Sequence, residues 1–132
     1  MATSRSLTPF SVVPTAWMTE KKITMADLGR LMMLQQRYTF FIQCHVASGE
    51  SYDIERVFWE SQERLAELLG FSIRSRSKVS EFLARMEEVG YIKQIRTKRF
   101  IDGKTKAKNY IVVNNPHIFE QFKGVNNEQD TE

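Results

Sequence analysis

The residues best suited to do chemistry in this chain are cationic side chains that alternate with serines. Arg74, Arg76 and Lys78 are separated by Ser75 and Ser77. Guanidinium and ammonium groups bind phosphate oxygens, and serine is short enough to let a backbone approach a phosphate. This pattern indicates a surface for a polyanion, although a solvated positive surface without a partner would have the same composition.

Most of the positive charge lies in one segment. The chain of 132 residues has a formal net charge of +3, but residues 74–108 hold 11 of its 19 basic side chains against four acidic ones. That segment has a net charge of +7, and the rest of the chain is acidic overall. Such asymmetry indicates a polyanion-binding face.

Residues for catalysis or metal binding are scarce. Cys44, the single cysteine, is adjacent to His45, so the two side chains point in different directions on a helix, and His117 is far along the chain. The sequence has no glycine-rich phosphate loop, nucleophile elbow or acidic cluster suited to metal-dependent cleavage. We therefore expect a protein that is not an enzyme and has no cofactor or metal.

Length and composition predict one packed domain, with 42% hydrophobic and 27% charged residues. The polar start, the single cysteine and the lack of a long apolar stretch predict a cytoplasmic protein without a membrane span. We divide the chain into an N-terminal arm over 1–23, a domain over 24–123 and a disordered acidic tail over 124–132.

The elements that must position the basic segment are helices followed by a hairpin. Thr24 and Asp27 resemble a capping box before a long helix to about residue 47. Ser61 is placed to cap a short second helix that ends at Gly70. A third helix ends at Gly90, and its N-cap stays open among Ser72, Ser75 and Ser77, with Ser75 or Ser77 favoured. Its predicted core positions are Val79, Phe82, Leu83, Met86 and Val89.

Beyond residue 90 the pattern changes to that of strands. Asp102-Gly103 is a strong hairpin signal, and we expect Phe100 and Tyr110 to pack this hairpin on the core. Asn115-Pro116 predicts a last short helix that continues past Phe122 to Gly124. The segment 52–59 fits a short strand or a helical turn, and residues 10–13 fit an edge strand or a packed arm.

Two stretches resemble a known family. Residues 61–72, SQERLAELLGFS, and residues 82–92, FLARMEEVGYI, are similar to winged helix-turn-helix DNA-binding proteins. That family includes bacterial transcriptional regulators and the amino-terminal domains of plasmid and phage replication initiators. The resemblance covers residues 24–113 and implies a mainly α fold with a small β hairpin (α+β). The chain departs from the family in residues 73–78, which make the turn before the recognition helix longer than is common.

The resemblance implies that the third helix enters the major groove of double-stranded DNA and that the hairpin contacts the backbone. The candidate DNA-binding residues lie at the amino end of that helix and on the hairpin. They are Arg74, Ser75, Arg76, Ser77, Lys78, Ser80 and Glu81, followed by Lys98, Arg99, Lys104, Lys106 and Lys108.

The function predicted from these residues is sequence-specific binding of double-stranded DNA. It would serve transcription regulation, which the size of the chain favours, or replication and maintenance of a mobile element such as a plasmid. The alternative is a winged helix that only binds proteins, but such a module does not need a +7 segment.

The long helix also has more apolar residues than one stripe requires. Met33, Leu34 and Phe40 widen that stripe. This favours a homodimer, unless the N-terminal arm covers the extra positions.

Overall fold

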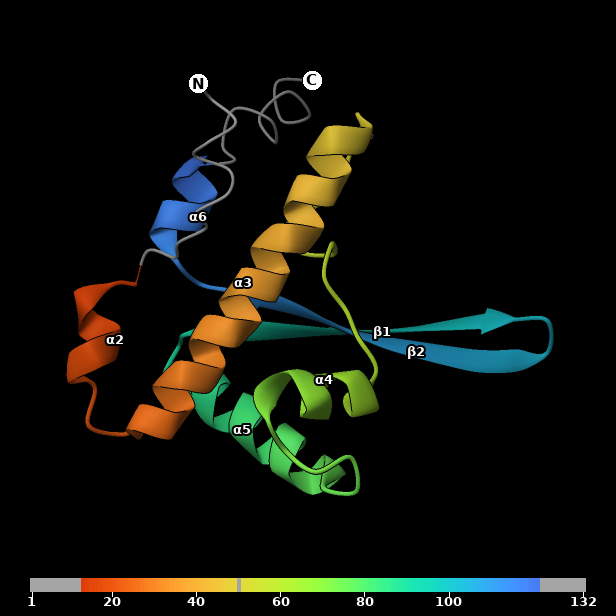
Figure 1. Ribbon diagram of the computed structural model, residues 1–132. Coiled ribbons are helices and arrows are strands. Elements are labelled where there is room, and N and C mark those ends of the chain that lie inside the picture. The colour runs from red at the N-terminus through yellow and green to blue at the C-terminus, as the bar shows by residue number, and fades with distance from the viewer. Residues whose placement is uncertain (1–12, 50, 122–132) are drawn as a thin grey trace.

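The computed structural model describes residues 13–49 and 51–121. Figure 1 shows a long helix that crosses the molecule, two shorter helices packed beside it, and a hairpin that projects beyond them. The predicted segments at 10–12 and 124–132, and the end of the last helix at Phe122, lie outside the described residues. The elements in chain order are α2 (Thr15–Thr19), α3 (Met25–Ser48), α4 (Gln62–Leu69), α5 (Arg76–Glu88), β1 (Ile92–Ile101), β2 (Lys104–Val113) and α6 (Pro116–Gln121).

Helix α3 is the long helix that the sequence predicts, and it begins with the predicted capping box. The Asp27 backbone N–H donates to Thr24 Oγ1 at 3.0 Å, and Asp27 Oδ2 accepts from the Thr24 N–H at 3.2 Å. The helix ends at Gly49, whose backbone is left-handed. One face of α3 forms the centre of the core through Leu31, Leu34, Tyr38 and Ile42, all fully buried.

Helices α4 and α5 form the predicted helix-turn-helix pair. Ser61 caps α4, since its Oγ accepts from the Arg64 N–H at 3.2 Å. Gly70 ends α4 with φ +80°, a conformation that glycine adopts without the strain of a side chain. Val79, Phe82, Leu83 and Met86 of α5 are buried as predicted, whereas Val89 is only half-buried.

Strands β1 and β2 form one antiparallel hairpin in which Ile92 pairs with Val113 and Ile101 pairs with Lys104. Asp102 and Gly103 turn the chain with φ +53° and +75°, as the Asp-Gly signal predicts. The segment 52–59 is neither the short strand nor the helical turn that the sequence allows. It has a turn closed by a hydrogen bond from the Arg56 N–H to Asp53 O at 2.8 Å, followed by an isolated β-bridge between Trp59 and Tyr110.

The sequence does not predict α2, which lies in the segment assigned to the N-terminal arm. Trp17 of α2 is buried and stacks on Tyr91 with ring centroids 5.3 Å apart. Helix α6 begins at Pro116 as predicted, and Asn115 Oδ1 accepts from the His117 N–H at 3.0 Å. Both short helices therefore pack onto the core near the base of the hairpin.

The fold class is the predicted one, mainly α with a small antiparallel hairpin. The order of α3, α4, α5 and the hairpin is that of a winged helix-turn-helix domain. Within the two described ranges, no helix combines the length and the hydrophobicity needed to cross a bilayer.

Candidate nucleic-acid interface

The amino end of α5 is formed by a turn of hydrogen-bonded serines. Ser75 is the N-cap, so one of the two favoured serines is correct. Ser72 O accepts from the Ser75 N–H at 2.9 Å, and Ser72 Oγ accepts from the Arg74 N–H at 3.3 Å. The Ser75 side chain makes no capping hydrogen bond. The turn therefore closes through Ser72 and leaves the Ser75 hydroxyl unused as a cap.

The structure brings the helix-end candidates together on about two turns of chain. Arg74, Arg76, Ser77, Lys78, Ser80 and Glu81 are exposed, and Ser75 is half-buried. None of these side chains forms a hydrogen bond or an ion pair within the part of the chain that the structure describes. Their charges and donors are therefore directed to solvent and available to a ligand.

The backbone adds to the positive potential at this end. The first turn of α5 has no acidic residue, and it starts with Arg76 and Lys78 within three positions. The first N–H groups of a helix lack intrahelical partners and carry partial positive charge. Together with the three cations of residues 74–78, they form a site that favours a phosphate group.

The carboxyl half of α5 is held to α3 by a buried carboxylate. Arg85 Nη2 donates to Asp27 Oδ1 at 2.8 Å, and Asp27 is only 4% exposed. Burial would raise the pKa of Asp27, but the hydrogen bonds from Arg85 and Thr24 and the positive charge of Arg85 outweigh it, so the pKa lies below its ordinary value. Asp27 therefore stays ionised while it accepts from the N-cap residue Thr24 of α3 and binds Arg85 of α5.

The turn between α4 and α5 is fixed by a second arginine of α3. Arg30 Nε donates to Leu69 O at 2.9 Å, and its guanidinium lies 4.2 Å from the centroid of the Phe71 ring. The same side chain thus satisfies a carbonyl at the end of α4 and stacks on the residue after Gly70. This contact sets where the turn, and hence the amino end of α5, stands relative to α3.

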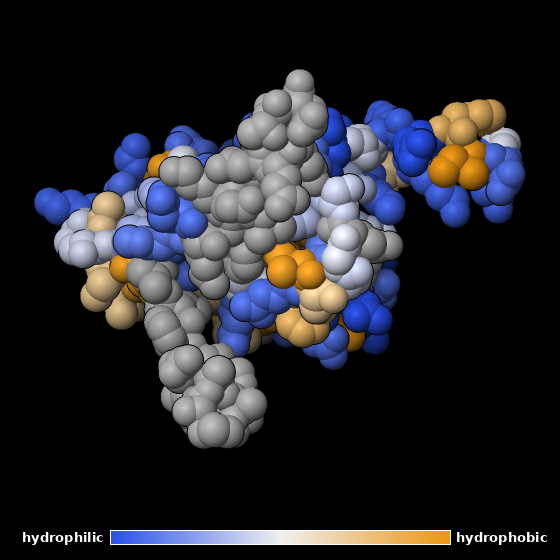
Figure 2. All heavy atoms as spheres, turned by 90° about the horizontal axis from the view of Figure 1, so that it is seen from above, coloured by the Kyte–Doolittle hydropathy of each residue, from blue (hydrophilic) through white to orange (hydrophobic). Residues whose placement is uncertain are grey.

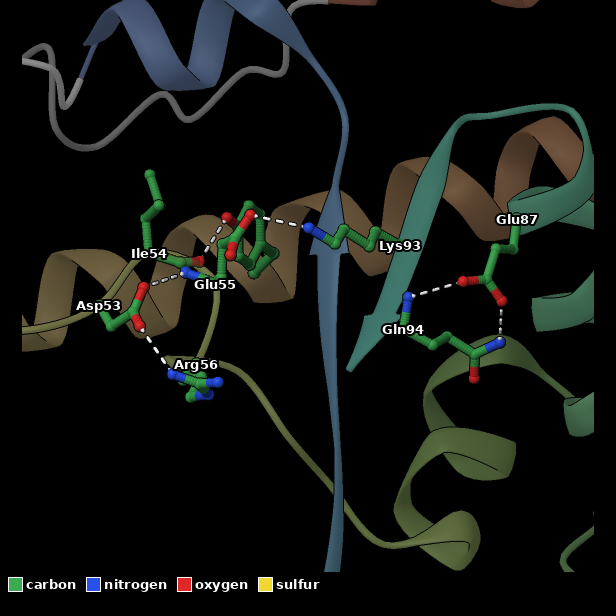
Figure 3. Close-up of polar contacts among 8 residues, drawn as sticks. Asp53, Ile54, Glu55, Arg56, Glu87, Lys93 and Gln94 are labelled. Carbon is green, nitrogen blue, oxygen red and sulfur yellow. Dashed lines mark hydrogen bonds and ion pairs between the residues drawn. The ribbon is translucent and has the colours of Figure 1, made fainter. Parts of the chain in front are cut away.

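Polar contacts hold the base of the hairpin against α5 and against the loop after α3 (Figure 3). Glu87 accepts from the Gln94 backbone N–H at 3.1 Å and from its side-chain amide at 2.9 Å. The Asn109 amide donates to Gln94 Oε1 at 2.7 Å, and Lys93 Nζ lies 3.0 Å from Glu55 Oε2. The orientation of the hairpin relative to α5 is therefore specified.

The hairpin candidates lie on the outer half of that element. Lys98, Arg99, Lys104 and Lys106 are exposed and form no ion pair with any described residue. The hairpin register places Arg99 directly opposite Lys106. Like charges that face each other destabilise an antiparallel pair, so this pair costs the hairpin some stability.

Lys108 differs from the other hairpin candidates. Its Nζ lies 5.0 Å from the centroid of the Trp59 ring, a cation–π contact at the bridge that joins Trp59 to β2. The interaction places Lys108 at the base of the projecting part, between the hairpin and the body of the protein.

One expectation for the hairpin is wrong. Phe100 does not pack on the core but is 75% exposed, and its neighbour Ile101 is 40% exposed. The register explains this, because both residues lie beside the turn at the far end of the hairpin. Tyr110 lies nearer the body and is half-buried. An aromatic residue type predicts that Phe100 is buried. The one signal for exposure is its position eight residues along β1 from the buried Ile92, close to the turn.

Histidine and cysteine do not come together with acids in the described ranges, where no group of three His, Cys, Asp or Glu could hold a metal ion. His45 Nδ1 is 3.0 Å from the Phe41 carbonyl oxygen, and Cys44 is exposed on α3. These two side chains therefore have separate surroundings.

No protein-family model matches the chain, and the search of curated proteins finds no relative. Solved structures that are similar in fold include the following two. One is described as the N-terminal domain of a DNA binding protein, with a TM-score of 0.54 and 15% identity over 97% of this chain and 94% of that chain. The other is described as the structure of a Rep–DNA complex, with a TM-score of 0.52 and 16% identity over 96% of this chain and 95% of that chain. At these identities the likeness shows the fold.

Proposed function

We propose that this chain binds a specific site in double-stranded DNA. The observation that carries the proposal is the cluster of Arg74, Arg76 and Lys78 at the amino end of α5, which is exposed and without a partner among the described residues. Figure 1 shows that this end of α5 and the projecting hairpin lie toward the same side of the molecule. In the proposal, one duplex lies along that side and contacts both.

The two parts of this surface have different roles in the proposal. The amino end of α5 enters the major groove, where an arginine can donate two hydrogen bonds to guanine and Glu81 can accept from cytosine. Ser77 and Ser80 are short donors for base edges or phosphates. Lys98, Arg99, Lys104 and Lys106 neutralise backbone phosphates, which adds affinity without reading sequence.

The biological role is control of a DNA site, through transcription or through replication and maintenance of a mobile element. The resemblance of residues 61–72 and 82–92 to winged helix regulators and replication initiators supports either role. The likeness in fold to a Rep–DNA complex is compatible with the second. The proposal includes no catalytic step, cofactor or metal.

We also propose a homodimer formed through α3. The exposed side of this helix has seven uncharged residues at alternating spacings of three and four, and Met33 and Phe40 among them are 44% and 50% exposed. This is the repeat of a helix that packs along another helix. A two-fold dimer would cover the face and read two half-sites. The seven residues are Ala26, Gly29, Met33, Gln36, Phe40, Gln43 and Ala47.

Sedimentation at micromolar concentration tests the dimer. Met33→Glu should shift the protein to a monomer because it places a charge in the proposed interface. Met18→Glu is the matched control, since Met18 is an exposed methionine of α2. If the unaltered protein is a monomer, or if both variants behave alike, the uncharged face of α3 is not a dimer interface.

The main experiment selects bound sequences from a random duplex pool and then measures binding against salt. An enriched inverted repeat is expected for a dimeric reader. With about five phosphate contacts, the logarithm of the binding constant should fall with the logarithm of salt concentration with a slope of about −4 to −5. No enrichment together with a flat salt dependence would overturn DNA binding and leave the protein-interaction module.

A further inference from the structure

The outer half of the hairpin is an arm that the rest of the described chain does not cover. From Arg96 to the turn and back to Lys108, nearly every residue is exposed. Six residue steps separate Ile95 from Ile101, which at about 3.3 Å per residue gives an arm of roughly 20 Å. Figure 1 shows this part projecting clear of the helices.

The end of the arm is apolar. Phe100 is the most exposed aromatic residue among those described, and Ile101 follows it directly before the turn. In the space-filling view of Figure 2, hydrophobic atoms gather at the far end of the projecting arm, with hydrophilic atoms around them. A large apolar group so far from the core contributes nothing to folding, so it calls for an explanation from binding.

Cations surround this apolar tip on both faces of the hairpin. Side chains alternate along a strand, so Phe100 shares its face with Arg96 and Lys98. Ile101 lies on the other face, together with Arg99 of the same strand. Lys104 and Lys106 of β2, which pair with Ile101 and Arg99, share that face. In the hairpin, Asp102 is the one acidic residue against seven cations.

This combination of charge and shape points to one class of ligand. A partner that fits this tip must have an apolar layer for the Phe100 ring and negative charges on both sides of that layer. The charges must be close enough to the ring for the neighbouring lysine and arginine side chains to reach them. The phosphates of a DNA duplex flank a stack of apolar base faces in this way. An acidic protein surface would match the cations, but it would match Phe100 only if an apolar groove separated its acidic residues.

We infer that Phe100 inserts between adjacent base pairs of the bound duplex and bends it, while the cations of the arm hold the flanking phosphates. The inference rests on the proposed DNA binding and deepens it by naming a residue that deforms the DNA. Apolar wedges of this kind enter from the minor groove and kink the duplex by about 20–90°. A duplex kinks most easily at a pyrimidine–purine step. The arm would therefore favour sequences with such a step at this position, although it makes no hydrogen bond to a base there.

The test uses the full chain and a duplex chosen by selection from the random pool. Energy transfer between dyes at the two duplex ends measures bending, and relaxation of a closed circular plasmid by topoisomerase measures unwinding. The unaltered protein should bend the duplex and lower the linking number. Phe100→Ala should abolish both effects and weaken binding by about 3- to 30-fold, and Phe100→Trp should retain them.

Thr105→Ala is the matched control, because Thr105 is exposed and pairs with Phe100 across the hairpin. It should leave bending and unwinding unchanged. Thermal melts should show all three variants folded, since residues 100 and 105 are exposed.

The outcomes separate the wedge from the proposed function. If the unaltered protein binds the duplex without bending or unwinding it, the wedge is overturned and DNA binding remains. The same conclusion follows if Phe100→Ala bends the duplex as much as the unaltered protein does. Loss of self-association by Phe100→Ala without a change in DNA bending overturns it too, and assigns the tip to a second copy of the chain. No duplex binding by the unaltered protein overturns the proposed function itself.

Discussion

Charged side chains lie at both ends of α5, but those near the carboxyl end have partners within the protein and those at the amino end have none in the part of the chain that the structure describes. Near the carboxyl end, Arg85 is bound to Asp27 at 2.8 Å and Glu87 accepts two hydrogen bonds from Gln94. At the amino end, Arg74 and Arg76 are exposed and have no side-chain partner among the described residues. One end of the helix is fixed by its charges, and the other presents its charges to solvent.

The hairpin repeats this division along its length. At its base, Ile92, Ile111 and Val113 are buried, and Lys93 is paired with Glu55 at 3.0 Å. In the outer half, Arg99 faces Lys106 across the strands and Phe100 is exposed to solvent. The comparison teaches that the contacts that stabilise the fold and the surfaces proposed to bind DNA lie in separate parts of the same two elements. Changes in the anchored parts should therefore alter folding, and changes in the free parts should alter binding.

The largest expected effect is at the carboxylate that anchors α5. Asp27→Ala removes the side-chain half of the α3 capping box and the acceptor of Arg85, so it should lower the free energy of unfolding by about 2–4 kcal/mol. Urea denaturation measures this. Asp53→Ala is the control, because Asp53 makes only exposed contacts, an ion pair with Arg56 and a hydrogen bond from the Glu55 N–H, and it should cost less than about 1 kcal/mol. Equal losses would mean that the Asp27 contact does not anchor the helix.

The same carboxylate predicts a pH dependence. Its pKa is lower in the folded protein than in the unfolded chain, so its stabilising effect is complete above the unfolded pKa of about 3.9 and is lost as the pH falls through the folded value. Urea melts between about pH 3 and pH 6 should show the unaltered protein losing stability below about pH 4 more steeply than Asp27→Asn does. Parallel curves would contradict the assignment.

The next effect is in binding, at the free end of α5. Arg76→Ala should weaken binding to the selected DNA site by about 1–3 kcal/mol and relax the preference for bases at one position. Its free energy of unfolding should change by less than about 0.5 kcal/mol, since the side chain is exposed. Arg56→Ala, in the loop after α3, should leave the affinity unchanged. Fluorescence anisotropy with the selected and scrambled duplexes measures both.

Local signals in the sequence predict much of this scaffold. Thr24 with Asp27, Ser61 and the Asp102-Gly103 turn lie within a few residues of the structure they determine, and the structure confirms each. The three serines before α5 are a harder case, because each could cap the helix. Ser75 takes the position while Ser72 closes the turn, and neither outcome follows from residue type alone.

Features that depend on distant residues are not predicted. Helix α2 has no capping hydrogen bond and is held by the packing of Trp17 on Tyr91, which is remote in sequence. The Arg85–Asp27 contact spans 58 positions. Phe100 is misplaced in the prediction because an apolar residue type indicates burial, whereas the hairpin register places it beyond the core. The exposure of the candidate cations agrees with the prediction, and their contact with DNA remains a prediction.

A smaller effect concerns the turn that leads into the free end of α5. Gly70→Ala should lower the free energy of unfolding by about 1 kcal/mol, because alanine is strained at φ +80°. In the Met33→Glu background, which removes the proposed dimer contact, Gly29→Ala should raise it by about 0.5–1 kcal/mol, since Gly29 is inside α3 and an added Cβ meets no atom of the same chain within 4 Å. Thermal melts distinguish the two signs. Equal signs would show that Gly70 does not need its left-handed backbone.

The smallest effect separates the outer half of the hairpin from its base. Lys106→Ala should reduce the salt slope of DNA binding by about 0.9 and weaken all duplexes alike, as expected for one lost phosphate contact. Because Lys106 faces Arg99, its removal should also stabilise the fold by a few tenths of a kcal/mol. Lys93→Ala should leave the salt slope unchanged and slightly lower the free energy of unfolding, because Lys93 is paired with Glu55. A residue that weakens the fold while it strengthens DNA binding is retained for its ligand, and this pair of lysines measures that distinction within one strand pair.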